Sequence, residues 1–187
     1  MYKAIVADHK IYPQIRNNII FDGDSIVEGV QGRFGNNLPA YFSKIMHNKF
    51  NVYNVARGGS TFANQLLFAQ DVADKSNWPD YLYREHAEHN IVFVTCGTND
   101  IGIPGGPGLN AQELYNSMLL YVANMVSKGY EVIVGTVYPR NSWTGDPKDA
   151  IRLEYNQMLR DNWQSVNGLI GIVDYANDPI MGLQLST

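Results

Sequence analysis

Polar side chains and glycines suited to acyl transfer occur at three points of the sequence. Ser25 closes the segment Phe21-Asp22-Gly23-Asp24-Ser25, where a glycine permits a sharp turn after an apolar run and the serine oxygen can project as a nucleophile. Gly59 follows a second apolar run, and a glycine there lets a backbone N–H approach a substrate oxygen. Asn99 follows a third run and offers a side-chain amide. Each donor to a tetrahedral oxyanion is worth about 3 kcal/mol of barrier. The co-occurrence of a nucleophile and two such donors predicts serine-type acyl transfer.

The elements that must position these residues alternate along the chain, with short apolar runs between longer amphipathic segments. This is the pattern of repeated βα units around a parallel sheet. The order predicts an α/β three-layer sandwich with a five-stranded parallel sheet and right-handed crossovers. Ligands in such sheets bind beyond the carboxyl ends of the strands, where all three segments should meet. The predicted strands are 18–22, 51–55, 91–95, 131–137 and 169–174, and the predicted helices are 37–47, 61–75, 111–128 and 147–163.

Length and composition limit the classes of function. The 187 residues predict a single domain over 1–187, of which 1–17 form an N-terminal extension. A formal net charge of −4 gives no broad cationic surface, so neither nucleic acid nor a membrane is an expected partner. The lone cysteine, Cys96, lies in an apolar run and is interpreted as a buried structural residue. The sequence predicts no metal site and no cofactor.

The three segments resemble the conserved blocks of a known family, the SGNH or GDSL hydrolases. The matching pieces are Gly23-Asp24-Ser25, residues 54–61 (NVARGGST) and Gly97-Thr98-Asn99-Asp100, in the same order and each after a successive strand. The resemblance spans nearly the whole chain. It implies a flavodoxin-like sheet, a Ser25 nucleophile, and an oxyanion hole from the Ser25 N–H, the Gly59 N–H and the Asn99 side chain. It also implies ester substrates, often acetylated sugars or lipids.

The last block of that family, an Asp-x-x-His sequence after the final strand, is missing from this chain. Asp174 and Asp178 are each followed at the third position by a residue that is not a base. The topology places three of the four histidines at the opposite, amino-terminal edge of the sheet. Only the fourth has an unconstrained position. The three are His47, His86 and His89, and the fourth is His9.

Two hypotheses about the missing base differ in function. In the first, the domain is incomplete at its C-terminus and a companion chain or segment supplies the Asp-x-x-His pair. In the second, the base is lost and the domain is a catalytically inactive carbohydrate-binding or structural module of a larger assembly, such as a phage fibre. The first is favoured because the chain keeps Ser25, Gly59 and Asn99.

A rival chemistry is suggested by the segment Ile19-Ile20-Phe21-Asp22-Gly23-Asp24. It resembles the first motif of the haloacid dehalogenase phosphatases, in which Asp22 would be the nucleophile, Asp24 the acid and Mg²⁺ the partner. That family also needs a later acidic pair to hold the metal, and no adjacent pair of acidic residues follows any predicted strand. A Mg²⁺-dependent phosphatase is therefore the weaker hypothesis.

The loops beside Ser25 suggest a substrate. Tyr138 and Trp143 could stack on a sugar ring, or could pack only within their own loop, while Arg140 or Arg57 could bind a carboxylate. Asp24, next to the nucleophile, is also assigned to the substrate site. Because these loops are polar and glycine-rich, we expect a small acyl group on a carbohydrate, as in an O-acetylesterase.

The N-terminal residues 1–14 alternate charged and apolar side chains and lack the apolar core of a secretory signal. No other stretch reaches membrane-spanning length. We therefore expect a cytoplasmic protein, or one exported without a Sec signal, including as part of a viral particle.

Overall fold

The computed structural model describes residues 17–30, 37–47, 49–70, 77–102, 106–180 and 182. The predicted extension, 1–17, therefore lies outside the described residues except for Asn17. Five strands form one parallel sheet in the order β2-β1-β3-β4-β5, as the sequence predicts. The strands are β1 (Asn17–Gly23), β2 (Phe50–Asn54), β3 (His89–Thr95), β4 (Glu131–Gly135) and β5 (Leu169–Val173).

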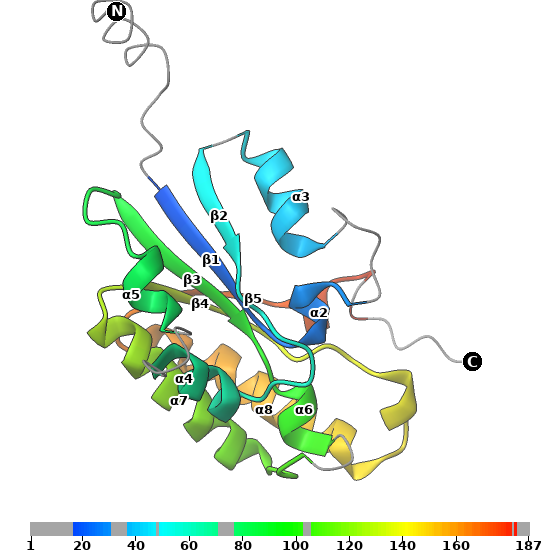
Figure 1. Cartoon of the computed structure of the whole chain (residues 1–187). Coiled ribbons are helices and arrows are strands. Elements are labelled where there is room, and N and C mark those ends of the chain that lie inside the picture. The colour runs from blue at the N-terminus through cyan, green and yellow to red at the C-terminus, as the bar shows by residue number, and fades with distance from the viewer. Residues whose placement is uncertain are drawn as a thin grey trace, which may run out of the picture.

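The helices cover both faces of this sheet, which gives three layers and confirms the predicted α/β class. In Figure 1, α3 lies on one face, and α4, α5, α7 and α8 lie on the other. The helices are α2 (Ser25–Glu28), α3 (Leu38–Ile45), α4 (Phe62–Gln70), α5 (Trp78–Leu82), α6 (Thr98–Gly102), α7 (Ala111–Ser127) and α8 (Pro147–Asn162), with 3-10 turns η1 (Asn141–Trp143), η2 (Trp163–Ser165) and η3 (Tyr175–Asn177). The four predicted helices correspond to α3, α4, α7 and α8, and residues 71–75 of the second prediction lie outside the described residues.

The larger part of the core lies between the sheet and α7. Ile20, Val92 and Val94 point to this side, where they pack with the apolar stripe of α7. Successive residues of a strand point to opposite faces, so Ile19 and Phe21 pack on the α3 side instead. Strands buried on both faces read as continuous apolar runs, which is why β1 and β3 were recognisable from the sequence. The stripe consists of Leu114, Met118, Tyr121, Val122 and Met125, all buried.

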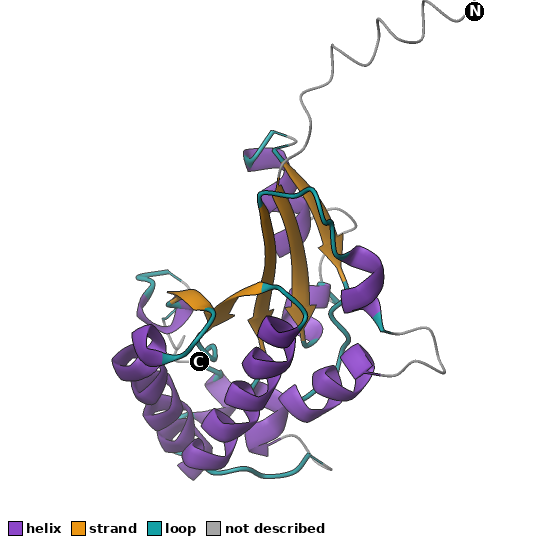
Figure 2. Cartoon of the chain, turned by 90° about the vertical axis from the view of Figure 1, so that its left-hand side faces the viewer, coloured by secondary structure: helices purple, strands orange, loops and turns teal. Residues whose placement is uncertain are grey.

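The face of the sheet under α3 is less completely covered. Ile91, Ile133 and Val173 are half-buried there, whereas Val92, Val132 and Val134 on the opposite face are fully buried. In Figure 2, the strands run through the upper centre of the view and most of the helices lie in its lower part. Within the described ranges, no helix combines the length and apolar character needed to cross a bilayer.

The strand order brings the predicted chemistry to one edge. Because β1 pairs with both β2 and β3, the loops that follow these three strands meet at their carboxyl ends. Ser25, Gly59 and Asn99 lie in these loops.

Candidate active site

Ser25 is the first residue of α2, directly after the turn that ends β1. Asp24 caps this helical turn by accepting the Ile26 N–H at 2.9 Å. Gly23 has a φ of +145°, and a β-carbon there would lie 2.4 Å from the carbonyl oxygen of Thr95. The turn therefore requires glycine. Ser25 itself is half-buried, so the turn presents it at the molecular surface.

A buried hydrogen-bond network holds the turn from below. Asp22 is fully buried and accepts the Gly23 N–H at 2.8 Å and the Tyr121 hydroxyl at 2.5 Å. Burial raises the pKa of Asp22 to about 7, although both hydrogen bonds and the charge of Arg57 act in the opposite direction. The carbonyl of Gly23 accepts the amide of Gln65 and the backbone N–H of Arg57. Sequence reasoning assigned Tyr121 and Gln65 no role at this turn, since both are distant from it in the chain.

This burial argues against the phosphatase hypothesis. Asp22 would have to attack a phosphorus atom, yet its side chain has no exposed surface and both oxygens are engaged. Asp24 would have to act as the acid, yet it is 2% exposed and caps α2. Because Asp24 is buried and caps α2, its predicted direct contact with substrate is not supported either.

Asn99 lies beside the loop that carries Gly59. Its amide nitrogen donates one hydrogen to the carbonyl of Ser60 at 2.8 Å, which fixes the amide against the loop that carries Gly59. An amide nitrogen carries two hydrogens, so the second remains for a substrate oxygen. Gly59 has a φ of +78°, and a β-carbon built on it would meet no atom within 4 Å. Open space therefore lies in front of this loop.

Asp100 strengthens the same connection between loops. One carboxylate oxygen accepts the N–H of Phe62, the first residue of α4, at 3.1 Å, while the other has no partner among the described residues. Burial raises the pKa of Asp100 to about 6, against the Phe62 hydrogen bond. Asn99 and Asp100 thus tie the loop after β3 to the loop after β2 at two points.

Glu28 is a residue of the site that sequence reasoning missed. It lies one helical turn after Ser25, and its carboxylate accepts the N–H of Gly58 at 2.5 Å. A β-carbon on Gly58 would lie 2.9 Å from this carboxylate oxygen and 3.6 Å from the β-carbon of Ser25. The three-residue spacing from Ser25 was a usable signal, because residues three apart share a helix face.

The residues predicted to bind substrate divide into exposed and buried groups. Arg57 is exposed, with its guanidinium over the ring of Phe68 at 4.0 Å. Arg140 is half-buried, with its guanidinium 5.5 Å from the ring of Trp143. Trp143 itself is only 4% exposed, so its ring supports Arg140 and is not open for a sugar to stack on.

Tyr138 is half-buried, and its ring stacks on that of Tyr175 with centroids 4.5 Å apart. One face of Tyr138 is therefore already covered. The two aromatic residues of this loop therefore pack largely within the protein, and Tyr138 does so against η3 and not only within its own loop.

Side chains from α8 fix the loops that follow β4 and β5. Asn156 is fully buried and bonds both the N–H and the carbonyl of Val137, at 2.8 and 2.9 Å. Arg160 makes two hydrogen bonds to Asp174, at 2.8 and 2.9 Å. These bonds lower the pKa of Asp174 and keep its carboxylate engaged.

The described histidines lie far from Ser25. His89, the first residue of β3, bonds Glu131, the first residue of β4, at 2.7 Å. The register pairs Asn17 with His89 and Gly23 with Thr95, so six residues, or about 20 Å, separate His89 from the catalytic edge. His47 and His86 precede β2 and β3 at the same remote edge, as predicted, and His9 lies outside the described residues.

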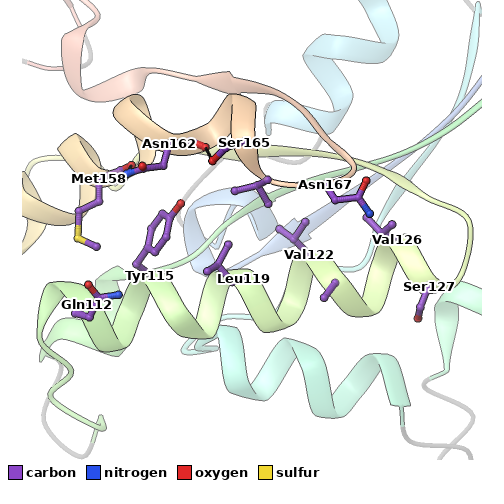
Figure 3. A pocket seen from close by; sticks show the side chains of 12 residues that line it. Gln112, Tyr115, Leu119, Val122, Val126, Ser127, Met158, Asn162, Ser165 and Asn167 are labelled. Carbon is purple, nitrogen blue, oxygen red and sulfur yellow. Dashed lines mark hydrogen bonds between the residues drawn. The ribbon is translucent and has the colours of Figure 1, made fainter.

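A groove of about 820 Å³ lies elsewhere, between α7 and α8 (Figure 3). Its walls include Tyr115, Leu119, Val126, Met158 and Val166. None of the residues assigned to the acyl-transfer site lines it. Its walls combine apolar and polar side chains, and no serine in them is paired with a histidine or a carboxylate.

The comparisons with known proteins agree with this geometry. A model of the GDSL-like lipase/acylhydrolase family matches residues 21–171. A lipolytic protein of the G-D-S-L family from Veillonella parvula is 23% identical, with a TM-score of 0.69 over 84% of this chain and 77% of that one. AlinE4, an SGNH-hydrolase family esterase, is 15% identical, with a TM-score of 0.64 over 91% and 84% of the two chains. A putative acylhydrolase from Bacteroides fragilis is 22% identical, with a TM-score of 0.59 over 92% and 76%.

No curated protein matches the chain in sequence. The family model nevertheless spans most of the chain and includes Ser25, Gly59 and Asn99. The chain therefore belongs to the GDSL-like lipase/acylhydrolase family and is an ester hydrolase.

Proposed function

We propose that the protein removes a short acyl group, such as acetyl, from a carbohydrate ester, with Ser25 as the nucleophile. The observation that carries the proposal is the link between Asn99 and Ser60, which sets a side-chain amide beside the Gly59 loop. Glycines and polar side chains dominate these loops, and the groove between α7 and α8 shares no residue with them. A small acyl group suits such surroundings better than a long chain.

The chemistry follows from the positions of these groups. The Ser25 oxygen attacks the ester carbonyl and passes its proton to a base. The N–H groups of Ser25 and Gly59 and the second amide hydrogen of Asn99 stabilise the resulting oxyanion. Collapse of this intermediate expels the alcohol, which takes up the proton, and leaves an acyl group on Ser25. Attack by water then releases the acid and restores the serine.

We propose that a companion segment carrying an Asp-His pair supplies the base. Two observations support this. No described histidine lies near Ser25, and the sheet face that holds Ile133 and Val173 is incompletely covered. A segment packed on that face would end beside the carboxyl edge of the sheet. Mass spectrometry of the protein isolated from its natural source tests this, because a companion peptide with Asp-x-x-His should be present.

Hydrolysis of 4-nitrophenyl acetate tests the function itself, with added imidazole as a substitute base. We expect turnover by the wild type to exceed that of Ser25→Ala by at least about 10³-fold with the companion present. With the chain alone, imidazole should raise the turnover of the wild type and leave the Ser25→Ala background unchanged. Equal rates for the two proteins under both conditions would disprove the proposal. A preference for octanoyl over acetyl esters would disprove the assignment to short acyl groups.

The second candidate is a carbohydrate-binding or structural module without activity, as in a phage fibre. It is favoured by one observation, the lack of a described base near Ser25. Sugar binding by the wild type, with no Ser25-dependent turnover in imidazole or with the companion, would establish it.

A further inference from the structure

Among the described arginines, the two near Ser25 differ from the others in their hydrogen bonding. Arg84 lies over the Tyr53 ring but also donates to the Tyr53 hydroxyl at 3.0 Å, and Arg152 and Arg160 each bond an aspartate. Arg57 and Arg140 contact aromatic rings alone. Within the part of the chain that the structure describes, neither makes a side-chain hydrogen bond or an ion pair. A guanidinium has five N–H donors, so both retain donors for a ligand.

These two arginines stand on opposite sides of the nucleophile. Arg57 follows β2, and its backbone N–H bonds the carbonyl of Gly23, two residues before Ser25, at 2.9 Å. Arg140 follows β4, on the other side of β1 in the strand order. Its charge also acts on Asp24. Burial raises the pKa of Asp24 to about 6, and the charge of Arg140 acts in the opposite direction.

Both side chains have fixed supports. The ring of Phe68 lies under Arg57 at 4.0 Å. Trp143, which supports Arg140, is 4% exposed, and its backbone N–H bonds the Arg140 carbonyl at 2.9 Å. The two hydrogen bonds between the Asn156 side chain and the Val137 backbone anchor the start of the same loop. A ligand would therefore meet cations that are already oriented, which reduces the entropy lost on binding.

The surroundings favour a ligand with a single negative charge. Arg57 and Arg140 are balanced by carboxyl groups near the same edge, buried at Asp24 and Asp100 and exposed at Glu28. A dianion such as phosphate would be repelled by these groups more strongly than a carboxylate. Arginine also presents its N–H groups in a fork that matches a carboxylate.

We propose that Arg57 and Arg140 form a subsite for a carboxylate in the alcohol part of the ester. The preferred substrate is then an acylated acidic sugar and not a neutral one. The inference rests on the proposed hydrolysis at Ser25, because the small acyl group occupies the oxyanion side and the charged alcohol extends between the arginines.

A matched pair of esters isolates this charge. 4-Acetoxybenzoate and 4-acetoxybenzamide share the acetyl group and the ring, and differ in the carboxylate. We expect kcat/KM to be at least about tenfold higher for the benzoate, mainly through KM, at low salt. Arg57→Gln and Arg140→Gln should each reduce this preference, and in the double variant the ratio of the two kcat/KM values should fall to about one.

Arg84→Gln is the control, because Arg84 lies near the start of β3, at the remote edge, and should retain the full preference. Raising NaCl from about 50 to 500 mM should reduce the preference in the wild type, since exposed charges are screened. A preference for the benzoate that survives in the double variant would overturn the proposal. So would a preference in the wild type that is the same at low and at high NaCl.

Binding separates this proposal from the hydrolysis it rests on. Calorimetry with Ser25→Ala, in the presence of each intact ester, measures affinity without turnover. Tighter binding of the benzoate, lost when both arginines are replaced, supports the subsite even if neither ester is hydrolysed. Equal affinity for the two esters overturns the subsite even if both are hydrolysed.

Discussion

At the scale of single residues, Asn99 has an observed bond and a proposed role. One amide hydrogen is held by the Ser60 carbonyl, and in the proposed mechanism the other binds the substrate oxygen. Replacement by alanine should lower kcat for 4-nitrophenyl acetate by about 10²–10³-fold with little change in KM, because the donor acts mainly on the transition state. Steady-state kinetics measure both parameters.

Asn99→Asp provides the matched comparison. It keeps the shape of the side chain but offers acceptors where donors are needed, so it should be as slow as Asn99→Ala. Near-normal turnover by Asn99→Asp would exclude the amide as an oxyanion donor.

Asp22 gives a prediction about pH. Its pKa is about 7 in the folded protein against an ordinary 3.8, so folding favours the neutral carboxyl. The stability that this group contributes is fully present below about pH 4 and is lost as the pH rises through about 7. Asp22→Asn should therefore weaken the fall in unfolding free energy between pH 5 and 8.5, by an amount on the order of 3 kcal/mol at most.

Urea unfolding at several pH values measures this effect. Asp80→Asn is the control, since Asp80 is exposed and its Lys128 partner lowers its pKa, so it is ionised throughout the range. If the unfolding free energies of the wild type and Asp22→Asn depended on pH in the same way, the raised pKa of Asp22 would be contradicted.

At the scale of elements, Asn156 joins α8 to the end of β4. Its replacement by alanine leaves the N–H and the carbonyl of Val137 buried without partners, which should cost about 3 kcal/mol of unfolding free energy. Asn162→Ala removes an amide from the exposed end of the same helix, where it bonds only the Met158 carbonyl, and should cost less than about 0.5 kcal/mol. Denaturant unfolding compares the two variants. Similar losses of unfolding free energy would argue against a stabilising role for the bonds between Asn156 and Val137.

The sequence predicted the elements whose apolar pattern extends over many residues. α7 was recognisable from its stripe, and β1 and β3 from apolar runs that are buried on both faces. α2, α5 and α6 have four or five residues each, too few for a helical period to show. Their presence depends on caps and on contacts with the rest of the fold.

Within the site too, some residues follow from a local sequence pattern and others depend on tertiary contacts. Ser25, Gly59 and Asn99 could be placed because each follows a strand whose carboxyl end lies at one edge. The bonds of Glu28 to Gly58 and of Asp100 to Phe62 join residues 30 and 38 positions apart. No local pattern encodes them. The burial of Trp143 likewise depends on tertiary packing, which is why its sequence-based role in substrate stacking is not supported.

At the scale of the whole molecule, the two faces of the sheet contribute unequally to stability. Ile133 and Val134 are neighbours on β4, but Val134 is fully buried under the α7 side and Ile133 is half-buried on the α3 side. Val134→Ala should cost about 2 kcal/mol, because about 0.8 kcal/mol is lost for each buried methyl group and a cavity remains. Ile133→Ala should cost less, although it removes more atoms.

Thermal and denaturant unfolding test this order. If the companion segment proposed above packs on the face of Ile133, its presence should increase the cost of Ile133→Ala and leave that of Val134→Ala unchanged. A larger loss for Ile133→Ala in the isolated chain would contradict the assignment of the less covered face.

The position of β1 between β2 and β3 separates two tasks of the molecule. The loops with Ser25, Gly59 and Asn99 follow three adjacent strands and are bonded to one another, whereas the loop with Arg140 follows β4 and is anchored independently by α8. The loop after β4 can therefore be exchanged for one of different length or charge without displacing the hydrolytic group. Such modularity would let substrate range diverge rapidly between relatives while the reaction itself is inherited unchanged.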